Sequence, residues 1–426
     1  MILSRYACTI FLVSVLSAAP GKAPASSPPA NAHDQWAQFH GPRRDNKSTA
    51  KGLLARWPEG GPKLLWARKG VGKGYATVSI SGKNIYTAGN IDGHTVITAL
   101  NADGKILWQA KNGSVANRSY PGSRGTPTVD CGKVYHLGPD GPVVCLDAET
   151  GKEIWALNVL DRFKGKNCTW GLSESLLIDG QNVICTVGGA KTSIVALDKD
   201  TGKSVWTSPS VGDKPGYASP ITVEDDGLRQ IVTAMSQSIV SVAADTGKLL
   251  WKFEHRVWMD ENITTPIHHE GHIFVAGPGR GATLLKLKVD AGKKKCSVSP
   301  VWYNSKFDNQ HGGVVLSGGY VFGHAKKGSR LWCVEFKTGK TRYSVDHEAA
   351  GRKSASLTLA DGMLYILSDR KRVYLVPAGP DAFKPVSSFD ILPAGAGPLW
   401  AHPVVFGGRL YIRHDKILMA YDIRAK

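Results

Sequence analysis

Side chains that could bind a ligand recur through this 426-residue sequence, each just before or inside the first strand-like run of a repeating unit. They are aromatic rings, two imidazoles, one guanidinium and one ammonium group, carried by Tyr75, Arg124, Trp170, Tyr217, His311, Lys353, Trp400 and His402. If the fold gathers them around one axis, they would suit a polar or anionic ligand. The alternative interpretation is that they only fill and hydrogen-bond a closed channel.

Three oxygen-bearing residues extend this set toward catalysis. Glu174 and Asn262 fall at comparable places and could hold a divalent cation such as calcium through oxygen ligands. Asp308 lies near the start of the sixth unit and could serve as a general base. Carboxylates are otherwise scarce at these positions, and the spacings Gly-x-Ser-x-Gly, Cys-x-x-Cys and Cys-x-x-Cys-His are absent from the sequence. The simplest hydrolase, zinc and covalent haem signatures are therefore missing.

The elements that must position these residues are repeated hairpins. Each carries a version of the phrase Asp-x-x-Thr-Gly-Lys-x-x-Trp, in which a tight turn joins two strand-like runs. The Asp offers a side-chain acceptor and the Gly can adopt the positive φ that such a turn requires. The phrase is clear at 143–155, 194–206, 239–251 and 331–343, looser at 96–108 and degraded at 291–302.

An aromatic residue ends each unit and reveals the period. These residues are spaced by about 46 positions, the length of a propeller blade. From residue 61 to the end, the chain has room for eight such units. The closing aromatics are Trp66, Trp108, Trp155, Trp206, Trp251, Trp302, Tyr343 and Phe389.

The two ends of the repeat region predict how the ring closes. Residues 416–423 read as a third strand with no fourth after it, whereas the run from Leu64 to Trp66 reads as a fourth strand with no third before it. Their pairing would remove the open edge of the ring. We therefore predict an all-β, eight-bladed propeller of four-stranded antiparallel blades. It forms one domain over 61–426, preceded by a leader and lead-in segment over 26–60.

The first 25 residues have the layout of a secretory signal peptide. Arg5 precedes an apolar run over 6–19, which is too short to span a bilayer. We prefer cleavage after Ala25, with Ala32 as the alternative. Export would leave a mature chain without a transmembrane segment, in the periplasm or outside the cell.

Composition fits a folded, exported and basic protein. Hydrophobic residues make up 42% and charged residues 21%, which excludes a disordered chain, and the net charge is +18. Six cysteines would remain after export; their pairing is open, and we favour small core residues for Cys145 and Cys333. A chain this basic would associate with anionic envelope polymers, whereas an exported chain without a basic stripe is a poor candidate for nucleic acid.

The repeated phrase resembles the PQQ-repeat (quinoprotein-like) β-propeller family over roughly 61–426. The lead-in from Trp36 to Asp45 resembles that of exported bacterial members. The family contains pyrroloquinoline quinone (PQQ)-dependent alcohol dehydrogenases and the non-enzymatic propeller lipoprotein of the outer-membrane β-barrel assembly machinery. The adjacent cysteine pair of the classical alcohol dehydrogenases is absent here.

Two functions follow from this resemblance. The one we favour is a binding or scaffold protein of the bacterial envelope, which recognises a protein or an anionic glycan through the funnel face of the propeller. The other is a PQQ- and calcium-dependent alcohol or sugar dehydrogenase. In that case Glu174 and Asn262 would bind calcium, Asp308 would be the base, and the eight funnel residues would hold the cofactor.

Overall fold

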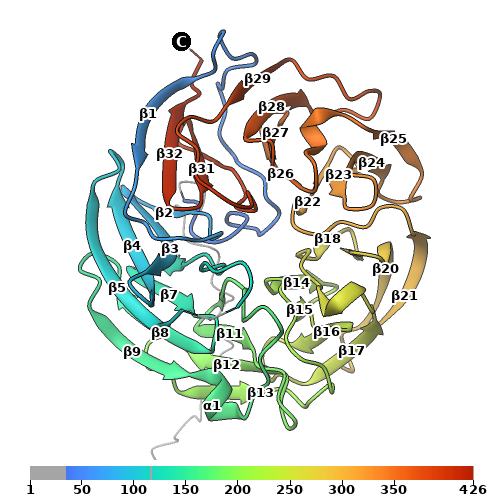
Figure 1. The fold of residues 1–426 in the computed structure, drawn as a ribbon. Helices are drawn as coiled ribbons and strands as arrows, with labels where there is room; N and C mark the ends of the chain where they lie inside the picture. Colours follow the sequence, from blue (N-terminus) through green and yellow to red (C-terminus); the bar gives the residue numbers. More distant parts are fainter. Residues whose placement is uncertain (1–34, 116–117, 426) are drawn as a thin grey trace, which may run out of the picture.

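The computed structural model describes residues 35–115 and 118–425, and these form a ring of eight four-stranded antiparallel sheets (Figure 1). Each of the first seven blades takes four consecutive strands, and its first strand is the innermost. The signal peptide and both cleavage sites predicted from the sequence lie outside the described residues. The predicted fold class and blade number are confirmed.

Blades one to four run in chain order around the ring. Their strands are β2 (Ser79–Ser81), β3 (Asn84–Ile91), β4 (His94–Asn101), β5 (Ile106–Ser114), β6 (Thr128–Asp130), β7 (Lys133–Leu137), β8 (Pro142–Asp147), β9 (Glu153–Asn158), β10 (Leu177–Asp179), β11 (Asn182–Thr186), β12 (Ile194–Asp198), β13 (Ser204–Thr207), β14 (Ile221–Asp225), β15 (Leu228–Ala234), β16 (Ser238–Ala243) and β17 (Leu249–Glu254).

Blades five to eight complete the ring, and the last blade borrows β1 from the start of the domain. The remaining strands are β18 (Ile267–His269), β19 (His272–Gly277), β20 (Gly281–Asp290), β21 (Lys295–Asn304), β22 (Val314–Ser317), β23 (Tyr320–Ala325), β24 (Arg330–Glu335), β25 (Thr341–Val345), β26 (Ala355–Ala360), β27 (Met363–Ser368), β28 (Arg372–Pro377), β29 (Ser387–Asp390), β30 (Val404–Phe406), β31 (Arg409–His414), β32 (Ile417–Asp422) and β1 (Lys63–Arg68).

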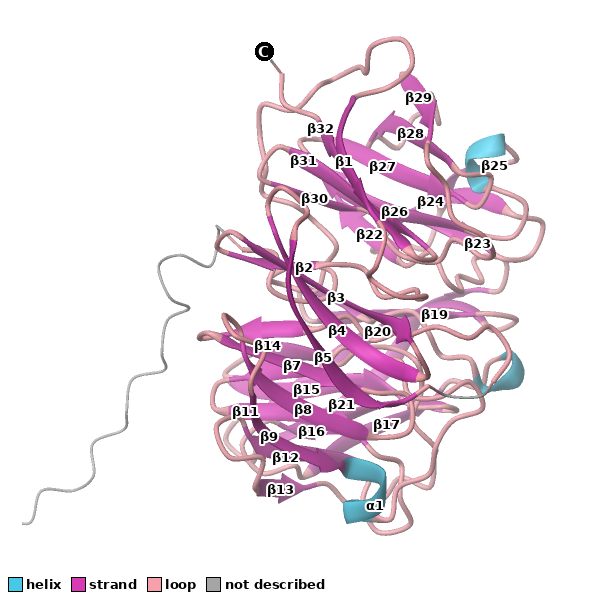
Figure 2. Ribbon diagram, turned by 60° about the vertical axis from the view of Figure 1, so that its left-hand side comes forward, coloured by secondary structure: helices cyan, strands magenta, loops and turns pink. Residues whose placement is uncertain are grey.

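Within 35–115 and 118–425, helical structure is confined to short turns between blades. The helix α1 (Val159–Phe163) lies at the edge of the molecule (Figure 2), and 3-10 turns occur at Trp258–Asp260 and Glu348–Ala350. No helix among the described residues has both the length and the apolar character needed to span a bilayer.

Five of the closing tryptophans fasten their blade to the next, whereas Trp251 donates to Gln230 of its own blade. The indole Nε1 of Trp155 donates to the carbonyl of Lys199 in the following blade, at 2.9 Å, and its ring covers Gly202 of the Thr-Gly-Lys turn. Gly202 has φ +69°, and a Cβ there would lie 2.8 Å from the indole. The repeated Gly is thus required both by the turn and by the neighbouring ring. Trp66, Trp108, Trp206 and Trp302 repeat this contact.

The ring closes through β1 and β32. Lys63 pairs with Asp422 and Arg68 with Leu418, in an antiparallel ladder interrupted by one bulge between Leu64 and Trp66. The predicted closure by the N-terminal strand is confirmed. Because β32 is already paired with β31, β1 supplies the outer strand of the eighth blade.

The lead-in segment crosses the central channel before it reaches β1, as the blue trace in the middle of Figure 1 shows. Trp36 bridges to Ile80 in the first blade, and Lys47 bridges to Leu359 in the seventh. Between them Arg44, only 3% exposed, donates to the carbonyls of Ser175, Leu176 and Pro220 in the third and fourth blades. The lead-in therefore blocks the channel and ties four blades together, which the sequence analysis did not anticipate.

Candidate functional site

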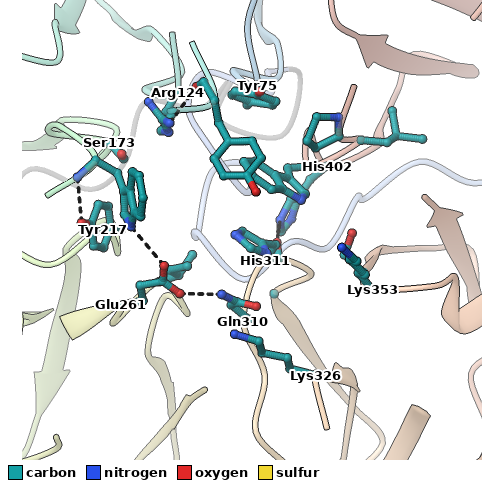
Figure 3. Close-up of a pocket in the computed structure, with 18 of the residues that line it drawn as sticks. Tyr75, Arg124, Ser173, Tyr217, Glu261, Gln310, His311, Lys326, Lys353 and His402 are labelled. Carbon is teal, nitrogen blue, oxygen red and sulfur yellow. Dashed lines mark hydrogen bonds between the residues drawn. The ribbon is translucent and has the colours of Figure 1, made fainter. Parts of the chain in front are cut away.

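A cavity of about 900 Å³ opens at the face where the innermost strands begin. Its walls come from the loops that lead into these strands and from turns at the same face (Figure 3). Side chains of all eight blades contribute, as a propeller geometry dictates. The lead-in segment contributes Phe39 and His40.

All eight residues predicted to face the funnel line this cavity. They lie within 28 lining residues, so the fold does gather them from sequence positions far apart. The eight are Tyr75, Arg124, Trp170, Tyr217, His311, Lys353, Trp400 and His402.

Aromatic rings form one wall. The indole of Trp400 stacks on the imidazole of His311, with centroids 4.3 Å apart and planes 5° apart. Tyr75 and Tyr120 pack against the same indole at 4.8 and 5.1 Å. Such a wall offers flat, rigid surface to a ligand.

Histidines connect the cavity to the lead-in segment. His402 donates from Nε2 to the carbonyl of His311 at 2.8 Å, and its Nδ1 lies 2.9 Å from Nε2 of His40. Burial lowers the pKa of His402 to about 4 and that of His311 to about 3, and it holds the pKa of His40 well below its ordinary value. These imidazoles are therefore neutral at neutral pH and act as hydrogen-bonding groups, not as charges.

The two acidic residues at the cavity already have internal partners. Glu261 accepts from Trp170 Nε1 at 3.1 Å and from Gln310 Nε2 at 2.5 Å, one bond to each carboxylate oxygen. Asp369 accepts from the backbone amides of Arg352 and Lys353 at 2.7 and 2.8 Å. Both carboxylates thus shape the wall.

The basic residues at the cavity differ from the acidic ones. Arg124, Lys326, Arg352 and Lys353 line it, and none of them forms an ion pair with another described residue. Arg124 donates to the carbonyl of Tyr120 at 2.9 Å, and burial lowers the pKa of its guanidinium. With four cations against two carboxylates and neutral histidines, the lining is net positive.

The predicted calcium ligands do not line the cavity. Glu174 is 1% exposed and accepts from the amide and hydroxyl of Thr186, at 2.8 and 2.6 Å. Burial raises the pKa of its carboxyl to about 7. Asn262 is also 1% exposed; its amide donates to the carbonyls of Met235 and His255, at 2.8 and 3.0 Å. Both side chains hold loops in place.

The predicted base Asp308 also lies outside the cavity lining. It is 4% exposed, and its carboxylate accepts from the amides of Lys327, at 3.0 Å, and Gly279, at 3.5 Å. Among the described residues, no group of three or more His, Cys, Asp or Glu side chains is arranged to hold a metal ion. The catalytic and calcium roles stay predictions without a site at this cavity.

Hydroxyl groups link the blades beneath the cavity. The amide of Thr77 donates to the hydroxyl of Thr126, that of Thr126 to Ser175, and that of Ser175 to Ser219, at 3.1, 2.9 and 2.9 Å. Thr265, the corresponding residue of the fifth blade, also lines the cavity, but its hydroxyl has no hydrogen-bond partner among the described residues.

Sequence reasoning missed several lining residues. Tyr120, Glu261 and Lys326 lie in loops or turns that carry no repeated phrase, and Phe39 and His40 come from a segment that seemed to precede the domain. The prolines that follow Thr126, Ser219 and Thr265 were the available signal for the hydroxyl contacts.

Comparison with known proteins agrees with this geometry. The PQQ_2 family, described as outer membrane protein assembly factor BamB, matches residues 48–192 and 190–299, more than half of the chain. The chain belongs to this family. The resemblance to PQQ-repeat propellers is confirmed.

Individual relatives are distant. BamB of Shewanella oneidensis is 23% identical over 284 residues, which cover 64% of this chain and 68% of that protein. The structure of BamB from Moraxella catarrhalis has a TM-score of 0.60 and 17% identity, covering 85% of this chain and 98% of that one. Quinohemoprotein alcohol dehydrogenase from Comamonas testosteroni reaches 0.64 with 14% identity, covering 93% and 82%. At these identities the two solved structures show the shared fold and do not separate the two functions.

Proposed function

We propose that this chain is an exported binding or scaffold protein of the bacterial envelope, which recognises a protein or glycan through its cavity face. The observation that carries the proposal is the cavity lining, where aromatic rings and unpaired cations surround carboxylates that already have internal partners. Such a lining can bind a ligand, and neither of its carboxylates is free to act as a base. Membership of the outer membrane assembly factor family supports a protein partner.

The dehydrogenase alternative demands more than this cavity offers. PQQ chemistry uses the quinone as oxidant, with a bound cation to polarise it and a base to take the alcohol proton. The oxygen donors expected for these roles are Glu174, Asn262 and Asp308, which hydrogen-bond to backbone outside the cavity. The residues present therefore do not fit a calcium-held quinone, and we derive no catalytic step.

One observation still favours testing PQQ. The aromatic wall and the cationic lining suit a planar anion even without calcium. Titration of the purified protein with PQQ and calcium, followed by dye-linked alcohol oxidation, should give at most binding of the anion without turnover. Both together would overturn the scaffold proposal.

The recognition surface can be mapped by photo-crosslinking in the bacterial envelope. A photoreactive phenylalanine analogue at Tyr120, at the cavity, should give discrete adducts with envelope components. The same analogue at Tyr303 on the outer strand β21 is the matched control, because the two tyrosines are 51% and 52% exposed. Equal adducts at both positions, or none at either, would contradict recognition through the cavity face. Recovery of the protein in the cytosolic fraction would contradict export.

A further inference from the structure

We propose that the cavity binds an acidic segment of a partner polypeptide that also carries a large apolar side chain. This inference rests on the proposed function and names the chemistry that the cavity face would recognise. Three features carry it: the distribution of positive charge, the exposed apolar mouth and the free polar group in the wall.

Positive charge is spread around the cavity and not gathered at one point. Figure 3 places Arg124 and Lys353 on opposite sides of the opening, with Lys326 at a third position. None of the three forms an ion pair with a described residue. A single small anion can contact one of these groups, whereas a chain with several carboxylates can reach them together. The charge pattern thus favours an extended polyanion.

The cavity also has an apolar edge. Trp258, Met259 and Tyr120 line it and remain 54%, 48% and 51% exposed, so three large, exposed side chains gather at one opening. The ammonium of Lys326 lies 3.9 Å from the centre of the Trp258 ring, so charge and apolar surface adjoin. Exposed aromatics of this kind anchor partner side chains at interfaces.

Backbone strain marks two of these residues. Tyr120 has φ +57° and Met259 φ +53°, a left-handed conformation that non-glycine residues adopt at a cost. Each therefore presents its side chain from a turn that the sequence alone would not favour. Strained turns of this kind cluster at binding sites.

The interior of the cavity suits a polypeptide. Its volume of about 900 Å³ is large enough for several residues, and Thr265, 4% exposed, leaves its hydroxyl without a partner among the described residues. That hydroxyl can donate to or accept from a peptide group. An acidic glycan would match the cations and could stack on Trp258, but it has no large apolar side chain to bury against Met259. We therefore favour a peptide over a glycan.

The test uses the full mature protein and short capped peptides, with binding measured by calorimetry. The probe has glutamates flanking one phenylalanine; in two comparison peptides lysines replace the glutamates or serine replaces the phenylalanine. We expect saturable binding of the first peptide only, weakening as salt is added. The double variant Lys326→Glu, Lys353→Glu should weaken it about tenfold, equivalent to 1.4 kcal/mol.

The matched control is Lys83→Glu, Lys105→Glu. It makes the same change in net charge, at exposed residues in turns at the opposite ends of the strands. Unchanged binding by this control, with unchanged melting temperatures for both double variants, would localise the effect to the cavity. Trp258→Ser should weaken binding of the phenylalanine-containing peptide without changing the melting temperature of the protein.

Several results would overturn the inference. Equal loss of peptide binding in both double variants would mean that non-specific charge attraction holds the peptide. Equal binding of the serine peptide would mean that the cavity does not recognise an apolar side chain. Binding of an oligogalacturonate in place of the peptide would mean that the cavity recognises an acidic glycan. In that case crosslinking at Tyr120 would still be expected, so the proposed function would survive while this inference fails.

Discussion

One hydrogen bond joins the imidazoles of His40 and His402. It runs between Nε2 of His40 and Nδ1 of His402, which lie 2.9 Å apart. His402 Nε2 faces the carbonyl of His311, which can only accept, so Nε2 carries the hydrogen and Nδ1 carries a lone pair. His40 must then be the donor to His402. Protonation of His402 would put a hydrogen on Nδ1 as well, so His40 would have to change its tautomer to keep the contact.

This arrangement predicts acid sensitivity. The folded-state pKa of His402 is about 4, and burial also lowers the pKa of His136, His255 and His324 to about 4. Below pH 6.5 the unfolded chain takes up protons that the folded chain refuses, so stability present above this pH is lost as the pH falls toward 4. Urea unfolding at several pH values should show this. In the variant His402→Asn, the fall in unfolding free energy per pH unit should be smaller by up to about 1.4 kcal/mol. An unchanged slope would contradict the neutral pair.

Arg44 should be essential to the closed channel. Its guanidinium satisfies the carbonyls of Ser175, Leu176 and Pro220, and Arg44→Met would leave them without this donor in a buried site. We expect a loss of about 3 kcal/mol in unfolding free energy, measured in urea. Arg43→Met is the control, since Arg43 is exposed and its one ion pair among the described residues is with Asp45; its effect should stay within about 0.5 kcal/mol. Similar losses in both variants would refute the anchoring role.

The turn glycines should tolerate no side chain. In Gly202→Ala, the added Cβ would combine a positive φ with an atom 2.8 Å away in Trp155. We expect a loss of about 2 kcal/mol in unfolding free energy. Gly292→Ala lies in the degraded copy, where φ is not positive and the nearest neighbour is 3.7 Å away, so it should be neutral. Thermal melting of the two variants makes the comparison direct, and equal melting temperatures would argue against the indole contact.

A variant of Glu174 can distinguish a structural role of this residue from a role as a calcium ligand. Its carboxyl has a folded pKa of about 7, above its unfolded value, so its contribution to stability is present at low pH and lost as the pH rises through 7. As the pH rises from 4.5 to 8, the unfolding free energy of Glu174→Gln should therefore increase relative to that of the native protein, as measured by urea unfolding. Calcium should shift the melting temperature of both proteins equally. A calcium shift seen only with Glu174 present would restore the metal hypothesis.

The sequence predicted the ring well because the ring is repetitive. The Thr-Gly-Lys turns and the spacing from Trp66 to Phe389 are local patterns, and the unpaired runs at the two ends of the domain specify the closure. The funnel residues were also foreseeable, since each first strand begins at the same face.

The rest depends on contacts between segments without a repeat. Glu174 precedes a first strand as the lining residues do, yet its side chain turns toward Thr186. Nothing in the sequence distinguishes it from Glu261, which lines the cavity. The lead-in segment has no strand pattern either, so its path through the channel is visible only once the blades surround it.

The pairing of β1 with β32 also orders events during synthesis. Lys63 and its partner Asp422 are 359 positions apart. The strand β1 is synthesised first, and it cannot pair until β32 has been made. Until then β1 has no partner strand, and the ring cannot be complete in a partly synthesised chain. The ring therefore stays open until the C-terminal strand has been made.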